Sequence, residues 1–196
     1  MDAKHEIAQT AARLVVEEGL EYGAAKRRAL KQLGTGARSA LPDNDLVEDA
    51  VREYIAIFCA DTQPTELEAL RRLALTWMER LAEFRPYLCG AVWRGTATRL
   101  SDIWLQLFCD DPKSAEIALI DKRVDYLART VTGFNGEPVE ALSFSSVSRE
   151  LGEAIGVHLL IHDLDDVRGA LKPDSKGRVP RGDAGAVRAM LENQAL

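Results

Sequence analysis

Cysteine is scarce in this sequence and never closely paired. The 196 residues include three cysteines, an odd number with no Cys-x-x-Cys spacing: Cys59, Cys89 and Cys109. Disulfide-built domains and zinc ribbons both need cysteines in pairs. The sequence therefore excludes those two classes, and we expect free thiols that are buried or half-buried.

Long hydrophobic runs and an excess of positive charge are also absent. No window approaches the roughly 18 consecutive apolar residues that span a bilayer, and the opening MDAKHEIAQT lacks the apolar centre of a signal peptide. We therefore expect a cytoplasmic, bacterial-style protein without membrane contact. The formal net charge of -6 disfavours general nucleic-acid binding. No Gly-x-x-x-x-Gly-Lys-Ser/Thr loop supports ATP use of the P-loop kind.

Residues 1–84 have the apolar spacing of amphipathic helices. Apolar residues recur at three and four between Glu6 and Gln32, and two glycines divide this stretch into two helices. A third helix is predicted over 45–59. A fourth begins at Thr65, with Glu68 three residues on as a capping box. The sequence therefore predicts a helical N-terminal region.

The spacing of apolar residues changes from helical to alternating after residue 84. Alternation predicts strands at 102–108 and 157–162, and the Asn135-Gly136 pair predicts a hairpin between runs at 127–134 and 139–144. Helices are predicted at 112–126, 146–155 and 184–192. The sequence predicts an α+β fold: a helical region over 1–84, a mixed β-sheet with helices over 85–166, and a C-terminal tail with a short helix over 167–196. That tail is either a mobile appendage or a docking tail.

One motif carries chemical information. The stretch GAVWRGTATRLSDIW presents a glycine turn, an Arg-Gly pair and a Ser-Asp pair that opens a strand: Gly90, Arg94, Gly95, Ser101 and Asp102. This resembles the signature of the polymerase-β-like nucleotidyltransferase superfamily, particularly its minimal members. The resemblance covers about 85–163 and places Glu140, on a following strand, where such families have a third carboxylate. It implies a nucleotidyltransferase-like sheet.

Two functional positions of that signature are replaced. Ala91 stands where the family has a serine, and Trp104 stands where it has a second aspartate. Nucleotidyl transfer uses two divalent ions that share carboxylate ligands, and an indole ligates neither. The resemblance implies Mg²⁺ at Asp102 and Glu140 as catalytic and metal ligands, with Gly90, Arg94, Gly95 and Ser101 holding a nucleotide. The replacements predict lost or severely reduced catalysis, and therefore a nucleotide- or partner-binding protein.

Other hypotheses remain open at this point. An active nucleotidyltransferase would need a relocated carboxylate, from Asp110 or Asp163. A nucleic-acid module would use the basic stretch 24–38, which has five cations and no acidic residue: Lys26, Arg27, Arg28, Lys31 and Arg38. The helical N-terminal region is also a candidate surface for a protein partner. A strand over 157–162 would separate the Cα atoms of His158 and His162 by about 13 Å, too far for one metal ion, whereas a helix there would bring them close.

Overall fold

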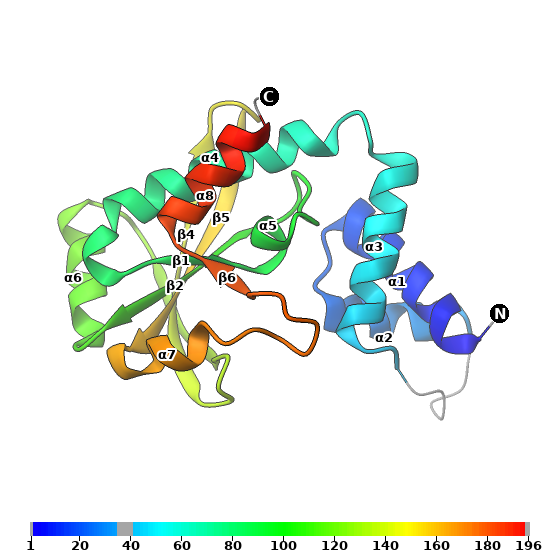
Figure 1. Ribbon diagram of the computed structural model, residues 1–196, viewed down its shortest axis with the longest axis horizontal. Helices are drawn as coiled ribbons and strands as arrows, with labels where there is room; N and C mark the ends of the chain where they lie inside the picture. Colours follow the sequence, from blue (N-terminus) through cyan, green and yellow to red (C-terminus); the bar gives the residue numbers. More distant parts are fainter. Residues whose placement is uncertain (1, 35–40, 195–196) are drawn as a thin grey trace. The chain divides into compact units, whose positions relative to one another are not determined.

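The computed structural model describes residues 2–34 and 41–194 (Figure 1). The chain divides into two compact units. Unit 1 comprises Met1–Glu66 with Thr96–Leu100, and unit 2 comprises Leu67–Gly95 with Ser101–Leu196. The division falls near residue 66 rather than 84, because most of the fourth helix packs on the sheet that follows it. Among the described residues, no helix is long and apolar enough to cross a membrane.

The described residues of unit 1 include three helices around an apolar core: α1 (Ala3–Glu18), α2 (Tyr22–Gln32) and α3 (Asn44–Phe58). Gly19 ends α1 in the left-handed conformation at φ 69°, which glycine adopts without the steric cost of a Cβ. The Asp43 carboxylate caps α3 by accepting a 2.8 Å hydrogen bond from the Leu46 N–H. The core comes from all three helices and includes Ile7, Ala11, Leu14, Ala25, Ala29, Val47 and Val51.

Unit 2 is built on a six-stranded sheet of order β3-β4-β5-β2-β1-β6. The strands are β1 (Tyr87–Cys89), β2 (Ile103–Cys109), β3 (Leu127–Thr132), β4 (Pro138–Ser148), β5 (Glu153–Asp163) and β6 (Arg181–Gly182). The β2–β5 pair is parallel and the other pairs are antiparallel. The remaining elements are α4 (Gln63–Arg80), α5 (Gly90–Arg94), α6 (Pro112–Asp121), α7 (Val167–Ala170), α8 (Ala184–Gln194) and the 3-10 helices Ala82–Phe84 and Leu164–Asp166. The α+β class and the mixed sheet are therefore as predicted.

Strand register gives the sheet two distinct faces. Side chains alternate along each strand, and Trp104 pairs with His158, which pairs with Ser143. We call the side that carries these three residues the Trp104 face. The opposite side is the helix face, where Trp77 of α4 packs on Phe144 with ring centroids 4.5 Å apart. An ion pair between Arg188 and Glu79 joins α8 to α4 there.

One helix prediction was wrong, and another was wrong at its first residue. Residues 146–155 are not a helix: β4 continues to Ser148, the chain turns through Gly152 at φ 67°, and β5 begins at Glu153. The antiparallel ladder pairs Glu140–Ser148 of β4 with Glu153–Ile161 of β5, and this pairing outweighs a weak local helix preference. The fourth helix begins at Gln63, so Thr65 lies inside its first turn rather than capping it.

The hairpin prediction was confirmed, and the C-terminal tail is docked within unit 2 rather than mobile. Gly136, at φ 83°, lies in the turn that joins the antiparallel strands β3 and β4. The C-terminal residues are built into unit 2, because Arg181 and Gly182 pair with Cys89 and Leu88. Val187 and Leu191 of α8 are also buried.

Candidate functional site

The glycine turn at Gly90 is occupied by the Trp104 side chain. Gly90 follows β1 at φ 73°, and its neighbour Cys89 pairs with Trp104 across the strands. A Cβ built at Gly90 would lie 3.6 Å from Cδ1 of the indole. Trp104 also stacks on His158 with ring centroids 4.2 Å apart and 26° between the ring planes. The position that matches a second carboxylate therefore holds an aromatic ring that covers the turn.

A hydrogen-bonded chain of three side chains crosses the Trp104 face. His158 Nε2 lies 2.8 Å from Asp102 Oδ2, and His158 Nδ1 lies 2.8 Å from Ser143 Oγ. The residues come from three adjacent strands, since Asp102 directly precedes β2, His158 lies on β5 and Ser143 lies on β4. The Asp102 side chain is 45% exposed and that of His158 is 13% exposed. The Asp102 end of this hydrogen-bonded series is thus open to solvent, whereas the His158 imidazole is nearly enclosed.

The protonation of this chain follows from its hydrogen bonds. The bond from His158 lowers the pKa of Asp102, as does a further hydrogen bond from the Gly156 backbone, although burial opposes both. Asp102 is therefore a carboxylate that can only accept hydrogen bonds. His158 in its neutral form must then carry its proton on Nε2, which leaves the Nδ1 lone pair to accept the Ser143 hydroxyl proton.

Gly156 provides the space that the Asp102 carboxylate fills. Gly156 lies on β5 two residues before His158, on the same face of the sheet. A Cβ at this position would lie 2.6 Å from Asp102 Oδ1, closer than side-chain carbons approach. The glycine therefore allows the carboxylate to rest over the strand within reach of the imidazole.

Glu140 does not join Asp102, which corrects the predicted metal pair. Glu140 pairs with Ile161 of β5, and the side chain of Ile161 is on the face opposite that of His158. Glu140 instead lies close enough to Lys113 of α6 to contribute to the raised pKa of that amine, after the larger effect of Glu116. The sequence placed Glu140 on a strand correctly, but the face depends on a register that local sequence does not specify.

The four residues predicted to hold a nucleotide lie at two places: three are in or directly after α5, and the fourth is beside Asp102. Gly90 and Arg94 are the ends of α5, and Gly95 ends that helix at φ 85°. Ser101 directly precedes Asp102. Burial raises the pKa of the Cys89 thiol to about 11, and the positive charges of Arg181 and Arg94 act in the opposite direction. The role of the four residues toward a ligand stays a prediction.

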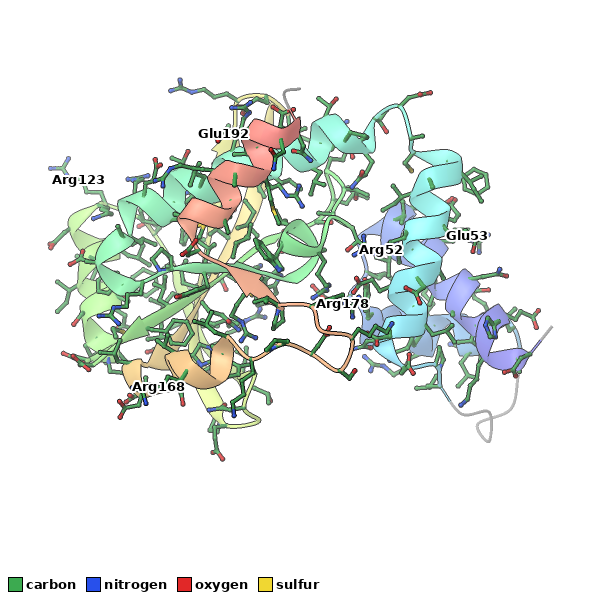
Figure 2. The ribbon with its side chains drawn as sticks, viewed as in Figure 1. Arg52, Glu53, Arg123, Arg168, Arg178 and Glu192 are labelled. Carbon is green, nitrogen blue, oxygen red and sulfur yellow. The ribbon has the colours of Figure 1, made fainter. Side chains whose placement is uncertain are left out.

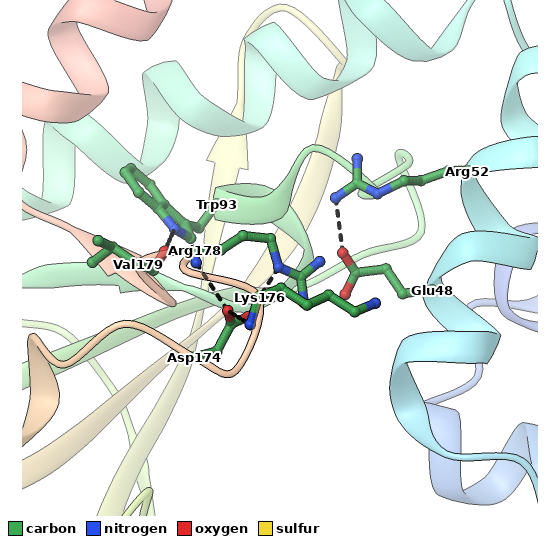
Figure 3. A network of polar contacts seen from close by, with 7 residues as sticks. All are labelled: Glu48, Arg52, Trp93, Asp174, Lys176, Arg178 and Val179. Carbon is green, nitrogen blue, oxygen red and sulfur yellow. Dashed lines mark hydrogen bonds and ion pairs between the residues drawn. The ribbon is translucent and has the colours of Figure 1, made fainter.

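Trp93 and the C-terminal loop have a packing role. Trp93 Nε1 donates a 2.9 Å hydrogen bond to the Val179 carbonyl (Figure 3). In the same view, Asp174 Oδ1 accepts hydrogen bonds from the backbone N–H groups of Lys176 and Arg178, and the Arg178 side chain bonds Oδ2. A Cβ on Gly182 would overlap the Trp93 ring. The indole therefore fixes residues 174–182 against unit 2.

A pocket of about 820 Å³ adjoins the Ser143 end of the chain. It lies where β4 continues past Leu127, the first residue of β3. Besides Ser143 and His158, its walls carry three cationic side chains and three aromatic ones: Arg80, Lys122, Arg123, Trp77, Tyr126 and Phe144. Arg123 projects from the molecule at the turn between α6 and β3 (Figure 2). Sequence reasoning missed this site because the cations come from two separate segments.

The residues of this site do not fit the expected Mg²⁺. Within residues 2–34 and 41–194, no group of three or more His, Cys, Asp or Glu side chains is arranged to hold a metal ion. Asp163 cannot replace the missing carboxylate, because it pairs with Cys109 at the far end of β2. That position is about 23 Å from Asp102 at ~3.3 Å per residue. Asp110 lies one residue farther on.

The basic stretch 24–38 contacts its own unit through two of its cations. Lys26 Nζ donates a 2.8 Å hydrogen bond to Asn44 Oδ1, and Arg28 forms an ion pair with Glu18 at 2.5 Å. Arg38 lies outside the described residues. Only part of the predicted cationic surface is therefore available to phosphates.

Comparisons with known proteins give a slight structural likeness only. No family model and no curated protein matches the sequence. Two solved structures are similar: the Cid1 poly(U) polymerase with MgGTP bound (15% identity, TM-score 0.35, 52% of this chain) and Cid1 with the UTP analogue UMPNPP (13%, 0.34, 57%). The chain spans 33% and 37% of those two chains. TM-scores this low assign neither a family nor a function to this chain.

Proposed function

We propose that unit 2 binds a nucleotide or a similar phosphate-bearing ligand in the pocket beside Ser143 and His158, without catalysing two-metal nucleotidyl transfer. The observation that carries the proposal is the pocket itself. Its volume of about 820 Å³ lies in the range typical of small-molecule sites, roughly 300–1,000 Å³.

The charges in the pocket favour an anionic ligand. Arg80, Lys122 and Arg123 line it, and Asp125 is the acidic residue among its lining groups. Phosphate oxygens accept hydrogen bonds from guanidinium and ammonium groups, and such charge-assisted bonds are stronger than neutral ones. The half-buried Tyr126 ring offers a flat apolar surface for a base.

The Trp104 face argues against metal-dependent chemistry at the same place. Asp102 is engaged with His158, Glu140 is on the helix face, and Trp104 fills the space over Gly90. Two-metal transfer needs carboxylates that converge on both ions. We therefore propose binding that depends on the cations and is independent of Mg²⁺.

Calorimetric titration with ATP, GTP, CTP and UTP, each with and without Mg²⁺, tests this function. We expect binding that survives chelation of Mg²⁺. The double variant Lys122→Gln/Arg123→Gln should weaken it at least ~10-fold, because each lost phosphate contact contributes about 1 kcal/mol or more. Arg149→Gln, on the exposed β4–β5 turn, is the control for a general loss of charge.

Two results of this titration would contradict the proposed binding mode. Binding that requires Mg²⁺ and disappears in Asp102→Asn would show that the carboxylate holds a metal, and the proposal would be wrong. Equal weakening in Lys122→Gln/Arg123→Gln and Arg149→Gln would indicate only nonspecific attraction.

A further inference from the structure

The chain Asp102–His158–Ser143 has the connectivity of a nucleophile and its base. The Asp102 carboxylate fixes the His158 proton on Nε2, and the Nδ1 lone pair faces the Ser143 hydroxyl at 2.8 Å. In the well-known serine hydrolases the histidine Nε2 contacts the serine and Nδ1 contacts the aspartate, which is the reverse of the arrangement at His158. The acid-base chemistry is the same, because either nitrogen of a neutral imidazole accepts a proton when the other one carries the hydrogen.

The imidazole is held in place from several directions. Asp102 bonds one end of the ring and Ser143 the other, while the Trp104 indole stacks on its flat side. All four residues lie on or next to paired strands, so their separations are set by the β-ladder rather than by loops. A base on rigid elements is preorganised for proton transfer.

Ser143 is also accessible, which a purely structural cross-strand bond would not require. It is half-buried and lines the pocket of about 820 Å³, whose other lining groups include Arg80, Lys122 and Arg123. The pocket therefore gives an ester room to approach Ser143 Oγ.

We propose that Ser143 is a nucleophile that accepts the acyl group of an ester, with His158 as its general base and Asp102 as the positioning residue. Ser143 Oγ forms a bond to the acyl carbon while its proton moves to His158 Nδ1. The bond between the acyl carbon and the ester oxygen then breaks, and the leaving alcohol takes that proton. Water attacks the acyl-serine by the same route, which releases the carboxylic acid and restores Ser143.

This proposal does not rest on nucleotide binding, and a neutral probe separates the two. The full-length protein is mixed with p-nitrophenyl acetate, release of p-nitrophenolate is followed, and acetylated residues are identified by peptide mass spectrometry. We expect a burst of p-nitrophenolate and acetyl on Ser143 of the wild-type protein. Because the probe carries no phosphate, failure of nucleotide binding would leave this result unchanged.

Variants then test the roles of the three residues. Ser143→Ala should abolish the burst, whereas Ser145→Ala should retain it, since Ser145 lies two positions along β4 on the same face and away from the imidazole. Asp102→Asn should slow acylation ~100-fold or more, because an amide donates to Nε2 and forces the proton onto Nδ1. Nitrogen NMR of the His158 ring should show that change of tautomer, which a loss of packing alone would not produce.

Several results would overturn the proposal. They are the absence of a burst, acetyl found on lysines or on Ser145 and not on Ser143, or an unchanged tautomer in Asp102→Asn with full acylation. The wild-type peptide map decides the matter even if a variant fails to fold.

Discussion

At the scale of single residues, Trp104 has the largest effect on the geometry of the site. Its indole covers Gly90 and stacks on His158, so it occupies space and orients a base rather than binding metal. We expect that Trp104→Asp does not create nucleotidyl transfer, because Glu140 remains on the helix face. It should also lower the free energy of unfolding by about 1–3 kcal/mol through lost aromatic packing.

Measurement of Mg²⁺-dependent product from ribonucleotide triphosphates checks this prediction. Trp104→Phe, which keeps an aromatic ring over His158, is the matched control and should retain most of the stability. Product formation by Trp104→Asp would show that the carboxylates converge after all.

His162 is the second residue with a measurable consequence. It is 1% exposed, neither ring nitrogen has a hydrogen-bond partner among the described residues, and burial lowers its pKa. Asp166 opposes this effect and Arg181 reinforces it, while the rings of Phe108 and Phe134 contact the imidazole. His162 is thus neutral in the folded protein.

The sign of the pH effect follows from that lowered pKa. The stability due to neutral His162 is fully present above the unfolded pKa of about 6.5 and is lost as pH falls below it, because the unfolded chain then binds a proton that the folded protein excludes. We expect the unfolding temperature to fall from pH 7 to pH 5. The decline should be smaller in His162→Phe. An identical decline in both proteins would assign it to other groups.

At the scale of elements, the short strand β6 tests whether the C-terminal residues belong to the sheet. Gly182 pairs with Leu88, and the Trp93 ring covers its Cα. We expect Gly182→Ala to lower the free energy of unfolding by about 1–3 kcal/mol, because the indole must move to admit a methyl group. Chemical denaturation gives the value. Gly185→Ala in α8 is the control, since its Cβ would meet only a 3.4 Å contact with Asp183 and alanine favours helix.

At this scale, the sequence predicted strands and turns that depend on local residue patterns. It missed the side-chain contacts that depend on the register between strands. Alternation in Ile103–Leu107 and the Asn135-Gly136 turn specified a strand and a hairpin locally. The partner of Asp102 was not predictable, because His158 is 56 positions away and reaches it only through the parallel β2–β5 pairing. Because the strand register was not predictable either, Glu140 was wrongly expected to lie beside Asp102. The predicted helix over 146–155 failed because tertiary strand pairing overrides weak local preference.

At the scale of the whole molecule, the distribution of tryptophan separates the two units. Trp77, Trp93 and Trp104 all belong to unit 2, so tryptophan fluorescence reports the unfolding of that unit, whereas far-ultraviolet circular dichroism reports both. A ligand that binds only the folded state raises stability by RT ln(1 + [L]/Kd), about 2.7 kcal/mol at a hundredfold excess over Kd. We expect a nucleotide at that excess to raise the fluorescence-detected midpoint.

Two variants locate the effect in one unit or the other. Lys122→Gln/Arg123→Gln should remove the shift, and Arg27→Gln in the basic stretch of unit 1 should keep it. A shift seen by circular dichroism without one in fluorescence, and lost in Arg27→Gln, would place phosphate recognition on the basic helix of unit 1. That outcome would favour the nucleic-acid hypothesis, because phosphate binding would then depend on the cations of α2. The pocket beside Ser143 would in that case have to bind an uncharged ligand.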